Sequence, residues 1–191
     1  MFKKNIYLAS KSPRRRMLLK KLGMQFKILN PQINEKISKK NPRHYAMELA
    51  KQKVMAVEDN IQKGVIIGVD TIVVINNKIL NKPHNKTEAR SMLKLLSRRQ
   101  HKVISGIYIL LKPQSKFWSK SAVSYVKFRK LSKNEIEQYI STREPYDKAG
   151  GYGIQEQASV FVEKLAGCYF NVVGLPISKL LFGLKSIIEY C

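Results

Sequence analysis

The chain's most apolar stretch is Val65-Ile66-Ile67-Gly68-Val69-Asp70-Thr71-Ile72-Val73-Val74-Ile75, in which Val and Ile predominate. β-Branched residues favour extended backbone, so this stretch predicts a buried β-strand. Asp70, one of only three aspartates in the chain, interrupts it. Because an unpaired buried carboxylate costs several kcal/mol, a cation, a bound metal or the mouth of a solvent-filled site must compensate it, unless backbone amides at a bend do so. Asp70 is therefore the strongest candidate for chemistry.

Outward from this strand, helix and strand signals alternate along the chain. Apolar runs predict further strands at 5–10, 25–29, 78–80, 102–111, 117–129 and 160–162. Capping residues and helix-opening prolines predict helices at 13–23, 42–57, 85–96 and 132–142 and from Pro176 onward, with a loop at 144–155. Such an order indicates an α/β protein with a mixed sheet. We expect one domain over residues 1–191.

A Ser-x-Ser-Pro turn, Ser10 to Pro13, joins the first predicted strand to its helix. Arg14, Arg15 and Arg16 follow in the first helical turn, where positive charge opposes the helix dipole. A strand end, a tight turn and a helix N-terminus bind anions, and arginines strengthen such a site for phosphate. A solvated basic helix end is the alternative.

The formal charge of +23 attracts polyanions and makes nucleic-acid binding a real competitor. Against it, the 27 lysines outnumber the nine arginines and are scattered over nearly every segment. Compositional drift is the simpler cause, and we do not expect specific nucleic-acid binding. The positive electrostatic field of the protein would still attract a small phosphorylated substrate toward its surface.

Two cysteines, Cys168 and Cys191, provide neither a disulfide framework nor metal-ligand spacing. We find no membrane span and no signal peptide, because every apolar run is too short. The expected setting is the cytoplasm, without membrane association.

Three motifs together resemble the Maf family of nucleoside triphosphate pyrophosphatases over nearly the whole chain. They are Leu8-Ala9-Ser10-Lys11-Ser12-Pro13-Arg14-Arg15, Gly68-Val69-Asp70-Thr71 with Lys82-Pro83 downstream, and Glu144-Pro145-Tyr146-Asp147-Lys148-Ala149-Gly150-Gly151-Tyr152-Gly153-Ile154-Gln155. Val173-Gly174-Leu175-Pro176 also fits. Each motif alone is weak, but their order and spacing around one aspartate are specific.

The resemblance implies a bent mixed sheet flanked by helices, with two lobes around a cleft, as in inosine triphosphate pyrophosphatases. It also implies hydrolysis of a nucleotide to its monophosphate and pyrophosphate, with Asp70 as general base and a divalent cation, Mg²⁺ or Mn²⁺, assisting. Glu35 matches an acidic position of the family that could hold the metal; the alternative is a surface acid in a Lys-rich loop. The family further suggests a homodimer.

The matching positions also imply substrate contacts. Ser10, Arg14, Lys53 and Lys82 would bind phosphate, the arginine bidentately and the lysines as point charges. Arg14, Thr71 and Gln155 look like the subfamily that acts on dTTP and UTP. Gln155 has a donor and an acceptor to read a pyrimidine ring, and Thr71 can pack a methyl group, although strand packing alone would also explain Thr71.

At several positions this chain departs from the family's usual residues, which limits how far the family's base selectivity can be transferred to it. Glu156, Gln157 and Ala158 follow Gln155 where the family usually has small glycines, and Asn81 and Cys168 replace a common glycine and aspartate. Lys148 is ambiguous: it could contact phosphate, or pair with its neighbour Asp147 to shape the loop.

Two functions of different classes follow. The first is a pyrophosphatase that removes dTTP, UTP or modified pyrimidine nucleotides. The second is a basic, non-catalytic binding protein acting on nucleic acid or on the cell-division machinery. The carboxylate at Asp70 favours catalysis, since binding a polyanion gains nothing from a negative group beside it.

Overall fold

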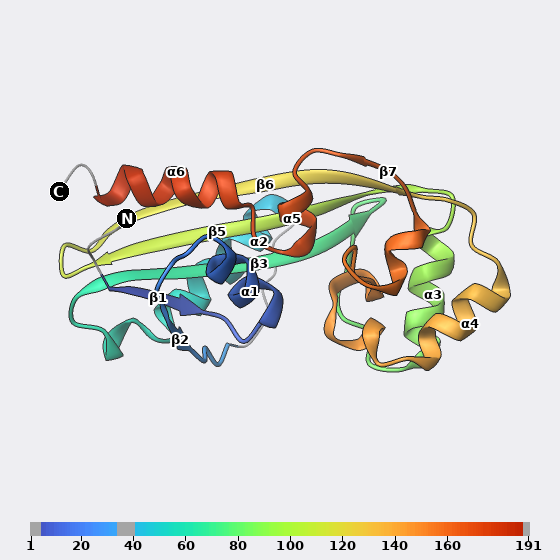
Figure 1. Cartoon of the computed structure of the whole chain (residues 1–191), viewed down its shortest axis with the longest axis horizontal. Helices are drawn as coiled ribbons and strands as arrows, with labels where there is room; N and C mark the ends of the chain where they lie inside the picture. Colours follow the sequence, from blue (N-terminus) through green and yellow to red (C-terminus); the bar gives the residue numbers. More distant parts are fainter. Residues whose placement is uncertain (1–4, 34–40, 189–191) are drawn as a thin grey trace. The chain divides into compact units, whose positions relative to one another are not determined.

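The computed structural model describes residues 5–33 and 41–188 (Figure 1). Its strands are β1 (Ile6–Ala9), β2 (Lys27–Leu29), β3 (Gly64–Ile75), β4 (Lys78–Leu80), β5 (Gln100–Lys112), β6 (Lys116–Phe128) and β7 (Val162–Ala166). Its α-helices are α1 (Pro13–Lys21), α2 (Pro42–Met55), α3 (Lys86–Leu96), α4 (Lys133–Ser141), α5 (Tyr169–Val173) and α6 (Ile177–Ile188). Short 3-10 turns are η1 (Glu58–Asn60), η2 (Glu144–Asp147), η3 (Ala149–Gly151) and η4 (Gln157–Phe161).

Within the described residues the strands form one seven-stranded mixed sheet in the order β2-β1-β3-β5-β6-β7, with β4 paired to β3. β1 runs parallel to both β2 and β3, whereas β3–β4 and β6–β7 are antiparallel. The predicted mixed α/β class is therefore confirmed. No helix of the described part of the chain is long and apolar enough to span a bilayer.

The chain divides into two compact units. Unit 1 comprises residues 1–70, 105–122 and 174–191, and unit 2 comprises residues 71–104 and 123–173. The long strands β3, β5 and β6 each contribute residues to both units. Asp70 is the last residue of its segment of unit 1, and Thr71 begins unit 2.

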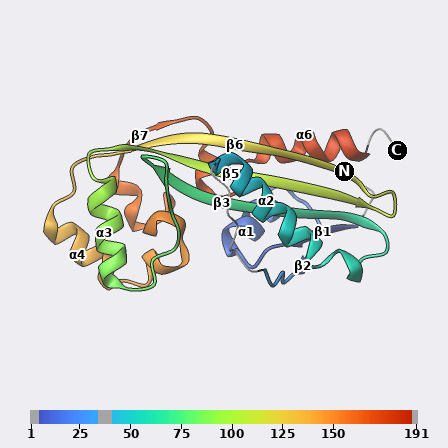
Figure 2. The same ribbon diagram turned by 180° about the vertical axis from the view of Figure 1, so that it is seen from behind.

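In unit 1, α2 and α6 cover opposite faces of the sheet (Figures 1 and 2). A Cβ built on Gly106 of β5 would lie 2.2 Å from the carbonyl oxygen of Ala46 in α2. On α6, a Cβ at Gly183 would lie 2.8 Å from Ile109 of the same strand. Gly106 and Ile109 are three residues apart, and alternation in a strand places them on opposite faces. Gly106 therefore lets the backbone of α2 approach the sheet closely, and Gly183 lets α6 pack closely on the side chains of Trp118 and Ile109.

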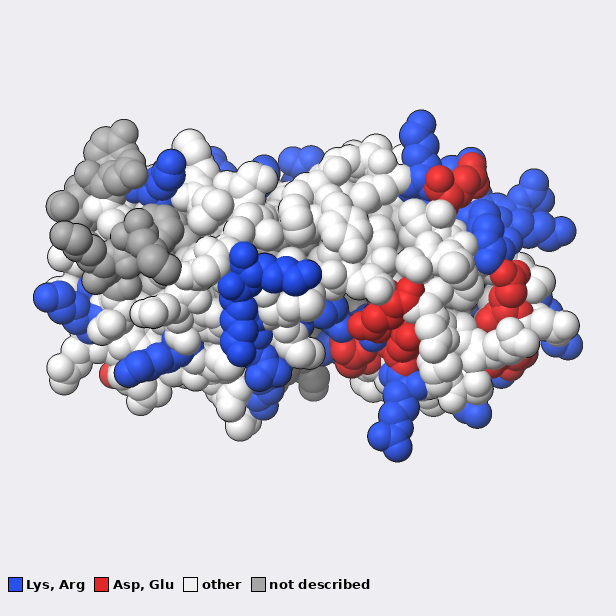
Figure 3. All heavy atoms as spheres, in the orientation of Figure 1, with Lys and Arg blue, Asp and Glu red and all other residues white. Residues whose placement is uncertain are grey.

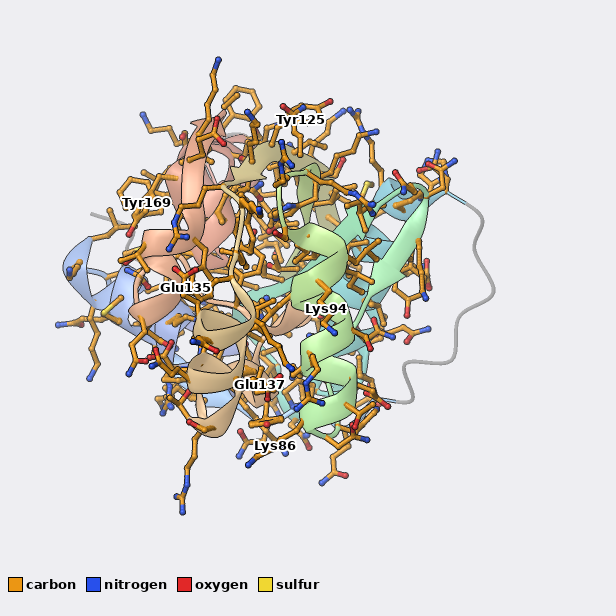
Figure 4. The ribbon with its side chains drawn as sticks, turned by 90° about the vertical axis from the view of Figure 1, so that its right-hand side faces the viewer. Lys86, Lys94, Tyr125, Glu135, Glu137 and Tyr169 are labelled. Atoms are coloured by element: carbon orange, nitrogen blue, oxygen red, sulfur yellow. The ribbon has the colours of Figure 1, made fainter. Side chains whose placement is uncertain are left out.

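Unit 2 has a separate core in which α3 and α4 lie side by side (Figure 4). Arg90 of α3 donates to both carboxylate oxygens of Glu137 on α4, at 2.6 and 2.8 Å. Ser132 and Glu135 form a capping box at the start of α4, within the helix predicted at 132–142. Asn76 and Asn77, both at positive φ, make the hairpin turn between β3 and β4.

Two local predictions are wrong. The strand expected at 160–162 is mostly the turn η4, and β7 begins at Val162 instead. Pairing with β6 determines the position of β7, in which Lys164 lies opposite Lys127. The charged side chain of Lys164 gives no apolar pattern from which a strand could be predicted. The helix predicted at 13–23 ends earlier, at Lys21, and Leu22 is an exposed residue that follows its last turn.

A buried histidine occupies the core of unit 2. The His101 ring packs edge-on against Phe128 and Tyr152, with centroids 5.1 and 5.4 Å away, and its Nε2 shares a 2.6 Å hydrogen bond with the Tyr152 hydroxyl. Burial lowers the pKa of His101 from 6.5 to about 4. The folded protein therefore holds this imidazole neutral at neutral pH.

This buried imidazole predicts acid sensitivity. The unfolded chain protonates His101 below its unfolded pKa while the folded chain resists, so stability is full above pH ~6.5 and falls until pH ~4. We expect about 2 kcal/mol of this loss at pH ~5 relative to pH ~7. Urea unfolding at both pH values measures it. His101→Gln should flatten the pH dependence, whereas His84→Gln, at an exposed position, should not; equal slopes in all three proteins would contradict the assignment.

Candidate active site

The buried carboxylate of Asp70 is paired with a lysine from the neighbouring helix. Asp70 lies on β3 and is 8% exposed. The Lys53 ammonium, on α2, donates a short hydrogen bond to Asp70 Oδ1. Of the compensating groups that the sequence left open, a cation is the one that the structure places here. Each charge stabilises the other in a site with little solvent access.

The packing of α2 on the sheet explains why these side chains meet. A Cβ on Gly68 would lie 2.2 Å from the carbonyl oxygen of Ala50, so β3 and α2 are in close contact at this point. Asp70, two residues after Gly68, points to the same face of the sheet. Lys53, three residues after Ala50, lies on the same side of the helix. The close approach at Gly68 thus brings the carboxylate within reach of the ammonium.

The predicted turn at the start of α1 is built around a buried arginine. The Ser12 side chain caps α1 by accepting from the backbone N–H of Arg15. The Ser10 hydroxyl accepts from Ser12 N at 3.2 Å and from Arg15 Nη1 at 3.0 Å. Arg15 Nε donates to the carbonyl oxygen of Gly174 at 2.9 Å. Ser10 is thereby fixed in place at the end of β1.

Arg15, in the turn at the start of α1, interacts electrostatically with Asp70. Burial lowers the pKa of Arg15, and the negative charge of Asp70 opposes that shift, while the positive charge of Arg14 adds to it. Two cations, Arg15 and Lys53, thus act on Asp70 within unit 1. The carboxylate is held in a positively charged setting, which suits a site for a polyanion.

Arg15 is the residue that the motif-based prediction missed. The family match assigns phosphate binding to Arg14, which is half-buried, whereas the neighbouring Arg15 is the arginine enclosed in the fold. Helical spacing carried the signal, because residue 15 shares a face with Leu18 and Leu19, three and four positions later. Both leucines are buried.

Three of the predicted substrate residues belong to unit 2. Thr71 follows Asp70 along β3 and is half-buried, whereas Lys82 and Gln155 are exposed. The loop of Lys82 is tied to the glycine-rich segment, since Gly150 N donates to the carbonyl oxygen of Asn81 at 3.0 Å. Asp70, Lys53 and Ser10 therefore all belong to unit 1. Thr71, Lys82 and Gln155 share unit 2.

The acidic residue proposed to hold a metal, Glu35, lies outside the described residues. Within residues 5–33 and 41–188 no cluster of three or more His, Cys, Asp or Glu side chains could bind a metal ion. Mg²⁺, however, is often held by one or two carboxylates together with substrate phosphates. A single carboxylate such as Asp70 is compatible with that mode.

The surface charge is dispersed on the face drawn in Figure 3. Lysines and arginines project at several separate points across this face, and most of the acidic side chains lie in its right-hand part. A nucleic-acid-binding face usually collects its basic residues into a patch or stripe. The distribution on this face thus agrees with the scattered lysines of the sequence.

Comparison with known proteins gives one consistent result. The profile of the family described as Maf-like protein matches residues 5–187. A protein of Carboxydothermus hydrogenoformans named dTTP/UTP pyrophosphatase is 48% identical over 175 residues, which cover 92% of this chain and 94% of that protein. Proteins of the same name from Clostridioides difficile and Bacillus anthracis are 46% and 43% identical, covering 92% and 95% of this chain and 91% and 95% of their own lengths.

Proposed function

This chain belongs to the Maf family, and from that premise we propose that it is a nucleoside triphosphate pyrophosphatase that hydrolyses dTTP and UTP. The products are the nucleoside monophosphate and pyrophosphate. The observation that carries the proposal is the buried Asp70–Lys53 pair, which the family's aspartate motif and the helix α2 bring together. Near-full coverage of relatives with this activity in their names supports it.

The proposed chemistry is attack of water on the α-phosphorus. Asp70 accepts a proton from the water as the oxygen–phosphorus bond forms, and the bond from the α-phosphorus to the bridging oxygen breaks, releasing pyrophosphate. The ammonium of Lys53 would keep Asp70 oriented, and its positive charge would attract the phosphate oxygens. Negative charge that develops on the leaving group is balanced by such fixed cations.

The remaining contacts divide between phosphate and base. Ser10, held at the end of β1, and the arginine Arg14 would bind phosphate oxygens at the helix N-terminus, with Lys82 adding a point charge. Thr71 and Gln155 would read the pyrimidine, through a methyl contact and through an amide that both donates and accepts. These five roles rest on the match to family positions.

We also propose that a divalent cation, Mg²⁺ or Mn²⁺, takes part. Hard carboxylate and phosphate oxygens suit either ion, so Asp70 and Glu35 are the side chains that would hold it together with the substrate. When bound, the cation would neutralise charge on the triphosphate. The homodimer stays a prediction, and we place the enzyme in the cytoplasm, where nucleoside triphosphates are made and polymerised.

Pyrophosphate release from a panel of canonical nucleoside triphosphates, assayed with Mg²⁺, with Mn²⁺ and with EDTA, tests this function. We expect turnover of dTTP and UTP to exceed that of the purine nucleotides by at least about tenfold, and EDTA to abolish it until metal is restored. Release from none of the nucleotides would contradict the proposal. In that case, salt-dependent titration of a labelled oligonucleotide would test the non-catalytic binding function.

A further inference from the structure

The ammonium of Lys148 is enclosed by oxygen atoms inside unit 2. The residue is 6% exposed. Its Nζ donates to Asp147 Oδ1 at 2.6 Å and to the carbonyl oxygen of Glu144 at 2.7 Å, and it lies 2.7 Å from Glu156 Oε2. Two of these contacts are donated hydrogen bonds, and the third is an ion pair. Lys148 therefore interacts with acceptors of its own unit, whereas Lys82 is exposed.

The same lysine holds both ends of the turn that carries Gln155. A Cβ on Gly153 would lie 2.7 Å from Cε and 2.9 Å from Cδ of Lys148, so the alkyl chain of the lysine packs directly against the backbone at Gly153. At the other end its ammonium binds Glu156. Glu156 N also donates to the carbonyl oxygen of Gly153 at 3.3 Å. Gln155 thus lies between two points fixed by one side chain.

The residue after this turn is attached to the same support. Gln157 N donates to Glu144 Oε1 at 3.3 Å, and the carbonyl oxygen of Glu144 accepts a hydrogen bond from the Lys148 ammonium. Glu144 N in turn donates to Thr142 Oγ1 at 3.2 Å, next to the end of α4. The backbone on either side of Gln155 is therefore connected to α4 through Glu144 and Lys148.

We propose that Lys148 and Glu156 act as positioning residues that aim the Gln155 amide and so determine which base the enzyme accepts. This rests on the function proposed above. Glu156, which departs from the small residues usual in the family, supplies the carboxylate that fixes the turn. An amide that both donates and accepts can distinguish bases only if its backbone holds it in one orientation. The ion pair performs that task without touching the substrate.

Glu156 is the better position to change. Its side chain is 36% exposed, and its removal leaves Lys148 with Asp147 and a carbonyl oxygen as acceptors, so the fold should survive. Removing Lys148 would instead empty a buried position beneath Gly153. Glu156→Ala deletes the contact, and Glu156→Gln keeps a hydrogen-bond acceptor without the charge.

We would measure kcat and KM of wild type, Glu156→Ala and Glu156→Gln with dTTP, UTP and dCTP. We expect Glu156→Ala to raise KM for dTTP and UTP about tenfold, to leave kcat within about twofold, and to lower the dTTP-to-dCTP preference about tenfold. Glu156→Gln should recover part of this loss. The control is Glu163→Ala, which removes the exposed 2.6 Å ion pair with Lys127 in the same unit and should leave the preference unchanged.

Amide hydrogen exchange of residues 149–161 separates this inference from the proposed function. We expect faster exchange there in Glu156→Ala and no change in α3 or α4. Unchanged exchange, or an unchanged base preference in an active enzyme, would overturn the positioning role. If the wild type released pyrophosphate from no nucleotide, the proposed function and the base-selectivity role would fail together, while exchange would still report whether Glu156 orders the turn.

Discussion

Replacing Asp70 by Asn is expected to reduce pyrophosphate release from dTTP and UTP by about 100- to 10,000-fold, the usual contribution of a general base. Asn matches Asp in size, and its amide oxygen can still accept from Lys53. What it lacks is the negative charge that accepts a proton from water. The loss should therefore fall on kcat, which initial rates over a range of nucleotide concentrations measure.

Two controls make this result specific to the carboxylate. Asp59→Asn changes an exposed aspartate of η1 in the same unit and should retain the wild-type rate. Thermal unfolding of Asp70→Asn with and without nucleotide tests whether the altered protein still folds and binds, since a ligand stabilises the state it binds. If Asp70→Asn keeps more than about a tenth of the wild-type kcat, Asp70 is not the base.

The second large effect concerns stability, and we expect Gly106→Ala to destabilise the protein by at least about 3 kcal/mol. The added Cβ would lie 2.2 Å from the oxygen and 2.3 Å from the carbon of the Ala46 carbonyl, and 2.4 Å from Met47 N. All three are backbone atoms of α2, so no side-chain rotation can relieve the contact. The helix that carries Lys53 would have to move away from the sheet.

Urea unfolding measures this change, or soluble yield if the variant fails to fold. Gly23→Ala is the matched control, because its new Cβ has no neighbour within 4 Å and only the φ of +67° opposes it. That strain should cost about 1 to 2 kcal/mol. Equal stabilities for the two variants would show that contact with α2 is not what requires glycine at position 106.

The sequence predicted elements well where the signal was local. Asn41 caps α2, and four apolar residues within the helix predicted at 42–57, Tyr45, Leu49, Val54 and Val57, are buried. Capping and apolar spacing are properties of a few neighbouring residues. The start of β7 was predicted wrongly because its partner strand β6, about 40 positions earlier, determines where pairing begins.

The candidate site was predictable to a similar extent. The apolar run around Asp70 required a compensating group, but only packing of α2 at Gly68 shows that Lys53 supplies it. Arg15 was passed over because a sequence gives no direct measure of which of three adjacent arginines is enclosed. Its acceptor, the carbonyl oxygen of Gly174, is 159 residues away and a backbone atom, so no side-chain pattern marks it.

The separation of Arg15 and Gly174 along the chain affects when this hydrogen bond can form during synthesis. Arg15 leaves the ribosome 159 residues ahead of Gly174, so the carbonyl oxygen that accepts from its Nε is available only after Gly174 emerges. Until then a buried guanidinium would lack one of its partners, an arrangement that folded proteins avoid. The turn that holds Ser10 is therefore completed only after residue 174 has been synthesised. A product truncated before Gly174 would keep every residue proposed to contact nucleotide, yet lack the acceptor that fixes the first of them.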